Sequence, residues 1–233
     1  MGNPLGVTAE LLAATGVCVM SPADVARGLG VDEDVWTGFA AHWEELAPDP
    51  YAAELGIQRL RRYGHYTFTD GVATPMPTGA FVQPHDSNPL YVERDRHFEP
   101  LTEAFARDPV LRRLLRLLGR FATALDDVAQ WTVKVHPFRV VASADGDGRP
   151  TPEGLHRDGV TLVTSLLIDR RNAIGGESTV FDGAGRQLLA TTLSEPGTLL
   201  LGDDRRTVHG VSPIRPVDRS APAVRDVLVI TFA

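Results

Sequence analysis

The chain has one cysteine, one lysine and no long uninterrupted apolar run. Because Cys18 is the only thiol among the 233 residues, an intramolecular disulfide and a thiolate-ligated metal site are both excluded. Cys18 lies in the apolar stretch 16–20, which favours a buried structural thiol. No stretch approaches the length needed to span a bilayer, and the N-terminus lacks the basic and apolar regions of a signal peptide. We therefore expect a cytoplasmic protein with no membrane association.

Basic residues are also scarce relative to acidic ones. The chain has 23 Lys and Arg residues against 30 Asp and Glu residues, a formal net charge of -7. Nucleic-acid binding needs clustered excess positive charge, so we expect no nucleic-acid partner. The hydrophobic content of 43% and the charged content of 23% are ordinary for a globular chain. A chain of this length can form a single mainly β or mixed domain, and we predict one domain over residues 1–233.

Residues 1–60 are predicted to be mainly helical. Ser21 followed by Pro22 is a typical helix start, and Trp36, Phe39 and Trp43 fall on one stripe of an amphipathic helix. His42 lies off that stripe and is expected to face solvent. These side chains predict core packing rather than a binding site.

Residues 61–233 are predicted to form a β core with one intervening helix near residues 109–129. The apolar stripe of that helix predicts packing against the outside of a sheet, while its arginines face solvent. Short apolar runs recur about every ten residues with turns between them, which is typical of a sandwich, jelly roll or barrel. The strand at 207–211 is expected to pair back on the strand at 198–201. The stripe consists of Leu111, Leu114, Leu115, Leu118, Ala122 and Leu125, and the predicted strands cover residues 61–69, 131–141, 160–168, 178–181, 187–192, 198–201, 207–211 and 226–232.

A Pro-, Asn- and Asp-rich segment at residues 74–96 separates the first predicted strand from the intervening helix. An irregular excursion of this length is usually functional or disordered. We therefore expect it to border a pocket through Phe81, Gln83, His85, Asn88 and Tyr91.

The strongest chemical signal is a histidine and an aspartate two residues apart, answered by a second histidine about fifty residues later. His156 and Asp158 share one face of an extended segment, and His209 lies in a short strand after a tight turn. Two histidines and one carboxylate on one side of an ion form the facial triad of non-haem Fe(II) enzymes, which leaves the opposite positions open. The alternative is a pair of turn residues beside an unrelated histidine, because the bare pattern also arises by chance.

An arginine at the start of the last strand provides a second signal. Arg225 opens an apolar strand and needs an anionic partner if it is buried. Asp226 is adjacent but points to the opposite face of the strand. A guanidinium in this position is suited to hold a dicarboxylate through a bidentate pair.

Four segments resemble the bacterial 2-oxoglutarate–Fe(II) dioxygenase family that includes L-isoleucine dioxygenase. They are Pro152-Glu153-Gly154-Leu155-His156-Arg157-Asp158-Gly159, Asn172-Ala173-Ile174-Gly175-Gly176-Glu177-Ser178, His209-Gly210-Val211-Ser212-Pro213-Ile214 and Arg225-Asp226-Val227-Leu228-Val229-Ile230-Thr231-Phe232. The resemblance implies a mainly β fold with flanking helices, namely a double-stranded β-helix or cupin-like jelly roll. It also implies an oxidoreductase that uses Fe(II), 2-oxoglutarate and O2 to hydroxylate an unactivated C–H bond of a free aliphatic L-amino acid, with release of succinate and CO2.

The resemblance also assigns roles to residues. His156, Asp158 and His209 would ligate Fe(II), and Arg225 would hold the distal carboxylate of 2-oxoglutarate. Related enzymes often place this arginine about ten residues after the second histidine, where Arg219 stands, so Arg219 is the alternative anchor.

Polar groups are also needed to orient the substrate. We predict that Glu177, Arg139 and His136 pair with its amine and carboxylate. Two other functions stay open, a metal-dependent cupin that does not hydroxylate (an isomerase or a dioxygenase that does not use 2-oxoglutarate) and a hydroxylase of a larger biosynthetic intermediate. The sequence indicates no oligomeric state.

Overall fold

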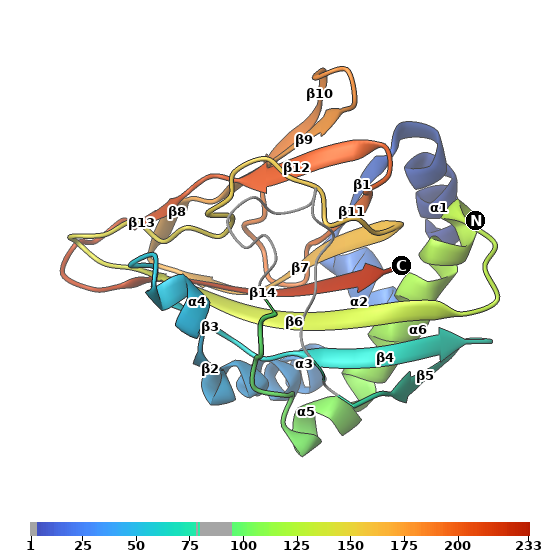
Figure 1. Cartoon of the computed structure of the whole chain (residues 1–233), viewed down its shortest axis with the longest axis horizontal. Helices are drawn as coiled ribbons and strands as arrows, with labels where there is room; N and C mark the ends of the chain where they lie inside the picture. The colour runs from blue at the N-terminus through green and yellow to red at the C-terminus, as the bar shows by residue number, and fades with distance from the viewer. Residues whose placement is uncertain (1–3, 78, 80–94) are drawn as a thin grey trace.

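The centre of the structure is a nine-stranded sheet that faces a three-stranded sheet (Figure 1). The structure is a computed structural model and describes residues 4–77, residue 79 and residues 95–233. Neighbouring strands of the large sheet run antiparallel. Its order is β1 (Val17–Met20), β11 (Leu199–Asp203), β7 (Leu162–Arg171), β14 (Ala223–Phe232), β6 (Trp131–Ala142), β3 (Arg59–Arg61) and β2 (Ala47–Pro48), and β4 (Gly64–Thr69) pairs with β6 and with β5 (Val72–Pro75).

Two smaller sheets complete the β structure. The three-stranded sheet has the order β10 (Gln187–Thr192), β9 (Glu177–Asp182) and β12 (Thr207–Val211), and a two-stranded sheet pairs β13 (Ile214–Pro216) with β8 (Ala173–Gly175). Antiparallel sheets that face one another form a jelly roll, which is the predicted fold class.

Helices cover the other face of the large sheet (Figure 1). Leu12, Phe39 and Leu114, from three different helices, belong to one buried core with Val135 of β6 and Leu228 of β14. This core uses one side of each central strand and leaves the other side for the cavity between the sheets. The helices are α1 (Pro4–Thr15), α2 (Pro22–Leu29), α3 (Glu33–Ala40), the 3-10 helix η1 (Ala41–Glu45), α4 (Pro50–Ala53), α5 (Glu103–Arg107) and α6 (Pro109–Leu125).

Strand alternation assigns the side chains of β14 to these two environments. Leu228, Ile230 and Phe232 are buried in the core beneath the helices. Arg225, Val227, Val229 and Thr231 line the cavity on the opposite side. The period of two residues along a strand requires this division, since successive side chains point to opposite faces. The strand that closes the hydrophobic core therefore also forms the floor of the cavity.

The predicted helix starts are confirmed. The Ser21 hydroxyl accepts a hydrogen bond from the Asp24 amide at the start of α2, and the Asp108 carboxylate accepts one from the Val110 amide at the start of α6. Four of the five predicted leucines of α6 are buried, whereas Arg112, Arg113 and Arg116 are exposed. Helix α6 is shorter than the predicted range because Asp126 adopts an extended conformation and ends it at Leu125.

Two expectations about individual positions were wrong. His42 does not face solvent, because its Nε2 lies 2.9 Å from Asp108 Oδ2 and its ring stacks on Phe105 at 4.5 Å. Strand β12 does not pair with β11 but with β9 of the facing sheet. Both edges of β11 are already occupied by β1 and β7, so the chain crosses to the other sheet.

The N-terminal part is mainly helical as predicted, but it also supplies strands to the large sheet. Val17–Met20 forms β1, and Cys18 on it is buried as expected. A run of four apolar residues does not reveal its partner, and here pairing with β11 decides its conformation. The predicted pocket residues Phe81, Gln83, His85, Asn88 and Tyr91 lie outside the described residues.

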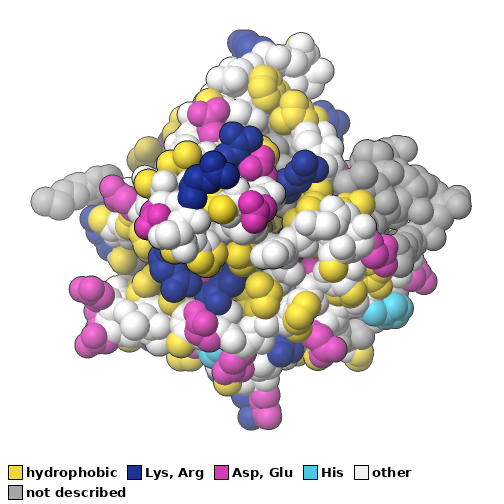
Figure 2. Space-filling model, turned by 90° about the vertical axis from the view of Figure 1, so that its left-hand side faces the viewer, with side chains coloured by type: hydrophobic (Ala, Val, Ile, Leu, Met, Phe, Trp, Pro, Cys, Tyr) yellow, Lys and Arg dark blue, Asp and Glu magenta, His cyan; other side chains and the backbone are white. Residues whose placement is uncertain are grey.

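The end of the molecule that carries β8 and β13 presents basic and acidic side chains intermingled with apolar ones (Figure 2). Arg215 of β13 pairs with Asp147 at 2.8 Å, so part of this charge is compensated locally. Within the described residues, no helix is long and apolar enough to cross a membrane.

We predict that Leu114→Ala lowers the free energy of unfolding by about 2–5 kcal/mol, because it leaves a cavity in the core beneath the sheet. Urea titration measures this change. Arg116→Ala, on the exposed face of the same helix, is the matched control and should change the value by no more than about 0.5 kcal/mol. Equal effects of the two substitutions would contradict the packing of α6 against the sheet.

Candidate active site

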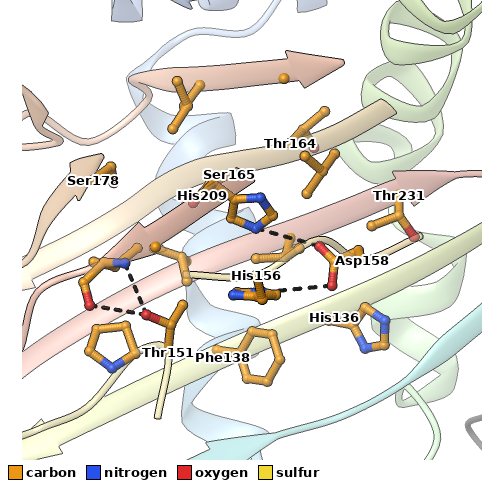
Figure 3. A pocket seen from close by; sticks show the side chains of 18 of the residues that line it. His136, Phe138, Thr151, His156, Asp158, Thr164, Ser165, Ser178, His209 and Thr231 are labelled. Atoms are coloured by element: carbon orange, nitrogen blue, oxygen red, sulfur yellow. Dashed lines mark hydrogen bonds and ion pairs between the residues drawn. The ribbon is translucent and has the colours of Figure 1, made fainter. Parts of the chain in front are cut away.

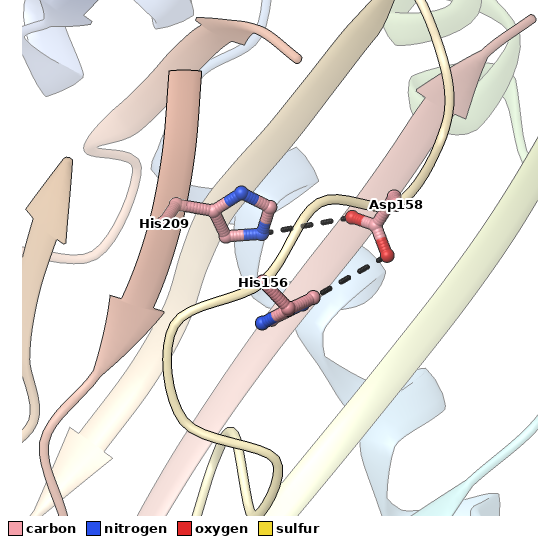
Figure 4. Close-up of side chains that lie close together, drawn as sticks. All are labelled: His156, Asp158 and His209. Carbon is pink, nitrogen blue, oxygen red and sulfur yellow. Dashed lines mark ion pairs between the residues drawn. The ribbon is translucent and has the colours of Figure 1, made fainter. Parts of the chain in front are cut away.

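The structure brings His156, Asp158 and His209 together (Figure 4). One ligand atom from each side chain lies within 4.8 Å of the other two. Asp158 Oδ1 is 3.9 Å from His156 Nε2, and Asp158 Oδ2 is 3.6 Å from His209 Nε2. Three ligands with bonds of about 2.1 Å at right angles around one ion would be about 3 Å apart. Contractions of up to about 2 Å between ligand atoms would therefore let all three reach a single metal ion.

Backbone pairing explains how residues so distant in sequence meet. His156 and His209 exchange two backbone hydrogen bonds of 2.9 Å each, so the segment before β7 is tied directly to β12. This segment pairs with β12 through an isolated bridge at His156 and is not part of a regular strand. The side chains of His156 and Asp158 still converge, because Asp158 turns toward both imidazoles.

A buried carboxylate, Asp204, holds the loop that carries Asp158. It accepts hydrogen bonds from the amides of Asp158, Gly159 and Val160 at 3.2, 2.8 and 3.1 Å. Burial and the nearby Asp158 carboxylate raise the pKa of Asp204. Sequence reasoning placed Asp204 in a turn and missed this contact, since a turn signal does not show what a side chain faces.

The second ring nitrogen orients His156 by a hydrogen bond, whereas that of His209 has no hydrogen-bond partner among the described residues. His156 Nδ1 lies 3.0 Å from the Gly154 carbonyl, to which it can only donate, so Nε2 is left with a lone pair toward Asp158. His209 Nδ1 lies 3.7 Å from Asp204 Oδ1, and its Nε2 faces Asp158. Burial lowers the pKa of His209, which favours the neutral ring that a metal ligand requires. The donor set fits a divalent metal that accepts nitrogen and oxygen ligands.

The triad borders a cavity between the large sheet and β9 and β12 (Figure 3). Its floor is formed by alternate residues of β6 and β14, among them His136, Phe138 and Thr231. In the close view, His136 and Thr231 lie toward the same end of the cavity as Asp158, whereas Thr151 and Ser178 lie toward the other. The cavity is therefore long enough to place groups on both sides of the triad.

Arg225 lines this cavity and is only 1% exposed. Within the described part of the chain, its Nε and Nη2 atoms have no hydrogen-bond partner. Its neighbour on β7 is Arg170, a like charge, and burial together with Arg170 lowers the pKa of Arg225 to about 10. A buried guanidinium without a carboxylate beside it fits a binding site for an anion.

The other predicted site residues divide between the cavity and other surfaces. His136 lines the cavity, whereas Arg139 lies on the opposite face of β6 and binds Asp226 through Nε and Nη2 at 2.8 and 2.7 Å. Glu177 is exposed at the start of β9 and does not line the cavity. Arg219 is exposed, and its Nη2 donates to the Ala144 carbonyl at 2.7 Å. Arg139, Glu177 and Arg219 are therefore not among the described residues that line the cavity.

Sequence reasoning also missed several basic residues of the cavity wall. Arg59, Arg61, Arg96 and Lys134 all line the cavity. They come from β3, β6 and the segment before α5, and no local pattern distinguishes them from surface arginines. The one available signal was spacing: Arg59 and Arg61 on one strand, and Lys134 and His136 on another, are two residues apart and so point to the same face.

Comparison with known proteins identifies the class of enzyme. A family model for 2OG-Fe dioxygenases matches residues 40–231, so the chain belongs to this family. The protein is accordingly a 2-oxoglutarate-dependent dioxygenase that uses Fe(II), 2-oxoglutarate and O2. Membership favours this function over the alternative of a cupin that does not use 2-oxoglutarate.

Individual relatives have similar sequences or folds. The 3(1)-hydroxy-L-isoleucine 4-dioxygenase of Pantoea ananatis is 27% identical over 201 residues, which are 82% of this chain and 77% of the relative. The crystal structure of a bsmA homolog from Methylobium petroleophilum is 37% identical with a TM-score of 0.88, covering 98% of this chain and 92% of its own. IDO from Bacillus thuringiensis, at 18% identity and a TM-score of 0.81, covers 100% of this chain and 96% of its own and shares the fold.

We predict that protonation of His136 makes stability pH-dependent. Burial and then Arg61, Lys134, Arg96 and Arg59 hold the pKa of His136 well below its ordinary value. Below about pH 6.5 the unfolded chain therefore binds a proton that the folded protein does not, and stability falls as the pH is lowered toward the folded-state pKa. The loss is up to about 1.4 kcal/mol per pH unit for this one group.

His136→Gln keeps an acceptor for Arg61, whose Nη2 lies 2.7 Å from His136 Nδ1. We expect this substitution to reduce the slope of unfolding free energy against pH between about 6.5 and 5. Urea titrations at several pH values measure the slope. The control His97→Gln removes an imidazole from an exposed position. Parallel slopes for the parent protein and His136→Gln would contradict a neutral His136.

Proposed function

We propose that the enzyme hydroxylates an unactivated C–H bond of a free aliphatic L-amino acid, with conversion of 2-oxoglutarate to succinate and CO2. The observation that carries the proposal is the convergence of His156, Asp158 and His209 in a cavity that also contains the buried Arg225. The substrate class is supported by the Pantoea ananatis relative, whose name describes a hydroxylated isoleucine. A single domain over residues 1–233 forms part of this proposal.

In the proposed site, His156 and His209 contribute Nε2 and Asp158 contributes a carboxylate oxygen to one Fe(II). When bound, the iron supplies O2 activation, by which one oxygen atom enters succinate and the other enters the hydroxylated product. The three ligands would hold one side of the ion and would leave positions on the cavity side open for other ligands. Asp204 holds the Asp158 loop through three amides and keeps the carboxylate aimed at both imidazoles.

Arg225 anchors the distal carboxylate of 2-oxoglutarate in this proposal. The side chain is held by strand pairing on both sides, with Val140 of β6 and Arg170 of β7 as register partners. Its guanidinium is therefore preorganised, and an incoming carboxylate would supply the negative charge that the described residues around it lack. Arg219 lacks this environment because it is exposed.

Apolar side chains also line the cavity that contains the triad and Arg225. Val227 and Val229 of β14 and Phe138 of β6 lie on the floor, and Val180 of β9 lies on the facing wall. An aliphatic substrate side chain would displace water from these surfaces and rest against them. Fixing its position near the open side of the metal makes hydroxylation of one carbon faster than that of others.

The proposed function is tested by screening free aliphatic L-amino acids for substrate-dependent release of succinate by the Fe(II)-loaded enzyme. We expect at least one to give equal amounts of succinate and hydroxylated product. Asp158→Ala should lose both Fe(II) binding and turnover, because it removes the anionic ligand. If no amino acid raises succinate release while a larger carboxylic acid does, the alternative of a biosynthetic intermediate is correct. Turnover by Asp158→Ala equal to that of the parent would refute the metal assignment.

We predict that Arg225→Met weakens 2-oxoglutarate binding by about tens- to thousands-fold, because a buried charge-assisted pair contributes roughly 2–5 kcal/mol. Methionine keeps most of the volume of arginine, so the fold is preserved. The matched control is Arg219→Met, which should change the apparent 2-oxoglutarate constant less than about twofold. Iron content, measured in parallel, should not change in either variant. A large effect of Arg219→Met with none of Arg225→Met would move the anchor to Arg219.

A further inference from the structure

Glu153 lies in a tight turn beside the metal site. Its side chain lines the cavity and is only 12% exposed. The turn spans residues 151–154 and is closed by the Gly154 amide, which donates to the Thr151 carbonyl at 3.0 Å. Proline at the second position of a turn, here Pro152, and glycine at the fourth favour a type I conformation. The local sequence therefore fixes the backbone that carries Glu153.

Two attachments tie this turn to β12, the strand that carries His209. Thr151, which is labelled in Figure 3, donates its hydroxyl to the Val211 carbonyl at 3.1 Å and accepts from the Val211 amide at 2.9 Å. Further along the chain, His156 and His209 exchange their two backbone hydrogen bonds. Glu153 lies between these attachments, so the backbone sets its position relative to the triad. A side chain on such a support loses little freedom when a ligand binds.

The carboxylate of Glu153 faces a ring nitrogen that does not donate to it. Glu153 Oε1 lies 3.4 Å from His156 Nε2, which is the atom assigned to the metal. The proton of the neutral ring is on Nδ1, which donates to the Gly154 carbonyl. Among the described residues, no lysine or arginine pairs with Glu153. A cation from outside the described chain can therefore pair with this carboxylate.

The position of Glu153 distinguishes it from the metal ligands. The ligand atoms of His156, Asp158 and His209 all lie within 4.8 Å of one another, and Glu153 does not belong to this group. It lies beside the triad, next to His156. Among the described residues that line the cavity, the carboxylates are Asp158 and Glu153. Asp158 is assigned to the metal, which leaves Glu153 as the acidic group that a ligand in the cavity can meet.

We propose that Glu153 binds the protonated amine of the substrate. The proposal rests on the proposed function, because it assumes an amino acid in the cavity. An ammonium group is a charged donor, and its hydrogen bond to a carboxylate is stronger than one to a neutral acceptor. Glu177, the partner of the amine predicted from the sequence, is exposed and does not line the cavity. The enzyme therefore selects substrates that carry a free amine, and acids without an amine bind more weakly.

The test measures binding by calorimetry in the enzyme loaded with Mn(II) and N-oxalylglycine, an unreactive analogue of 2-oxoglutarate. The probes are L-valine, L-leucine and L-isoleucine, together with two fragments of isoleucine. The first, 3-methylpentanoate, keeps the skeleton and the carboxylate without the amine, and the second, 2-methylbutylamine, keeps the amine without the carboxylate. We expect the best-bound amino acid to bind at least about tenfold more tightly than 3-methylpentanoate.

Glu153→Gln keeps the shape of the side chain and removes its charge. It should weaken binding of the amino acids at least about tenfold and change that of 3-methylpentanoate less than about threefold, because only the amino acids carry the ammonium group. The matched control is Glu177→Gln, which removes a carboxylate at the exposed start of β9 and should leave every affinity within about twofold. Mn(II) content and the affinity for N-oxalylglycine should not change in either variant.

The outcomes separate this proposal from the proposed function. Amino acids that bind to Glu153→Gln as tightly as to the parent would overturn the ammonium site even if succinate release identifies an amino-acid substrate. An equal loss for the amino acids and 3-methylpentanoate would indicate a structural role and would also overturn it. Loss of Mn(II) from Glu153→Gln would instead assign the residue to the metal.

The amine probe decides the remaining cases. Binding of 2-methylbutylamine that Glu153→Gln abolishes, without binding of any amino acid, would support the ammonium site while refuting the amino-acid substrate. Failure of every probe that carries an amine to bind to the parent would overturn the ammonium site.

Discussion

The two-residue period of the central strands β6 and β14 is the constraint on which the structure depends. One face of β14 buries Leu228, Ile230 and Phe232 beneath the helices, and this packing fixes the direction of every intervening side chain. Arg225 is thereby forced into the cavity despite the cost of burying its charge. A shift of one residue in register would exchange the two faces, so the hydrophobic core and the cavity wall are specified by the same pairing.

The same alternation on β6 places Arg139 on the helix side of the sheet and His136 on the cavity side. Arg139 lies on the helix side, where Asp226 and Glu44 neutralise it. On the cavity side of β6, two positions from Phe138, burial and then the surrounding cations lower the pKa of His136 and so favour its neutral form. Charges on the helix side are thus satisfied within the protein, whereas those on the cavity side include Arg225, for which the described residues provide no carboxylate partner. This difference is the physical basis for assigning ligand binding to one face of the sheet and stability to the other.

The metal site combines rigid and irregular elements. His209 belongs to β12, whereas His156 and Asp158 come from a loop. Two backbone hydrogen bonds to His209 and the carboxylate of Asp204 hold this loop in place. Asp158 lies near both imidazoles although its segment is not a regular strand. The family of 2OG-Fe dioxygenases to which the chain belongs uses such a donor set for Fe(II).

The sequence by itself determined the fold class, the long helix α6 and the residues of the candidate triad, because period, capping and donor type are local properties. It also indicated that Arg225 would need a partner other than Asp226, since neighbours on a strand face opposite ways. Only the tertiary structure decided which face of β6 meets the cavity, which separates His136 from Arg139. It likewise decided that β12 pairs with β9, that Asp204 supports Asp158, and that basic residues from separate segments line one cavity. These outcomes depend on which strand edges are occupied and on long-range burial, and no local pattern encodes either of them.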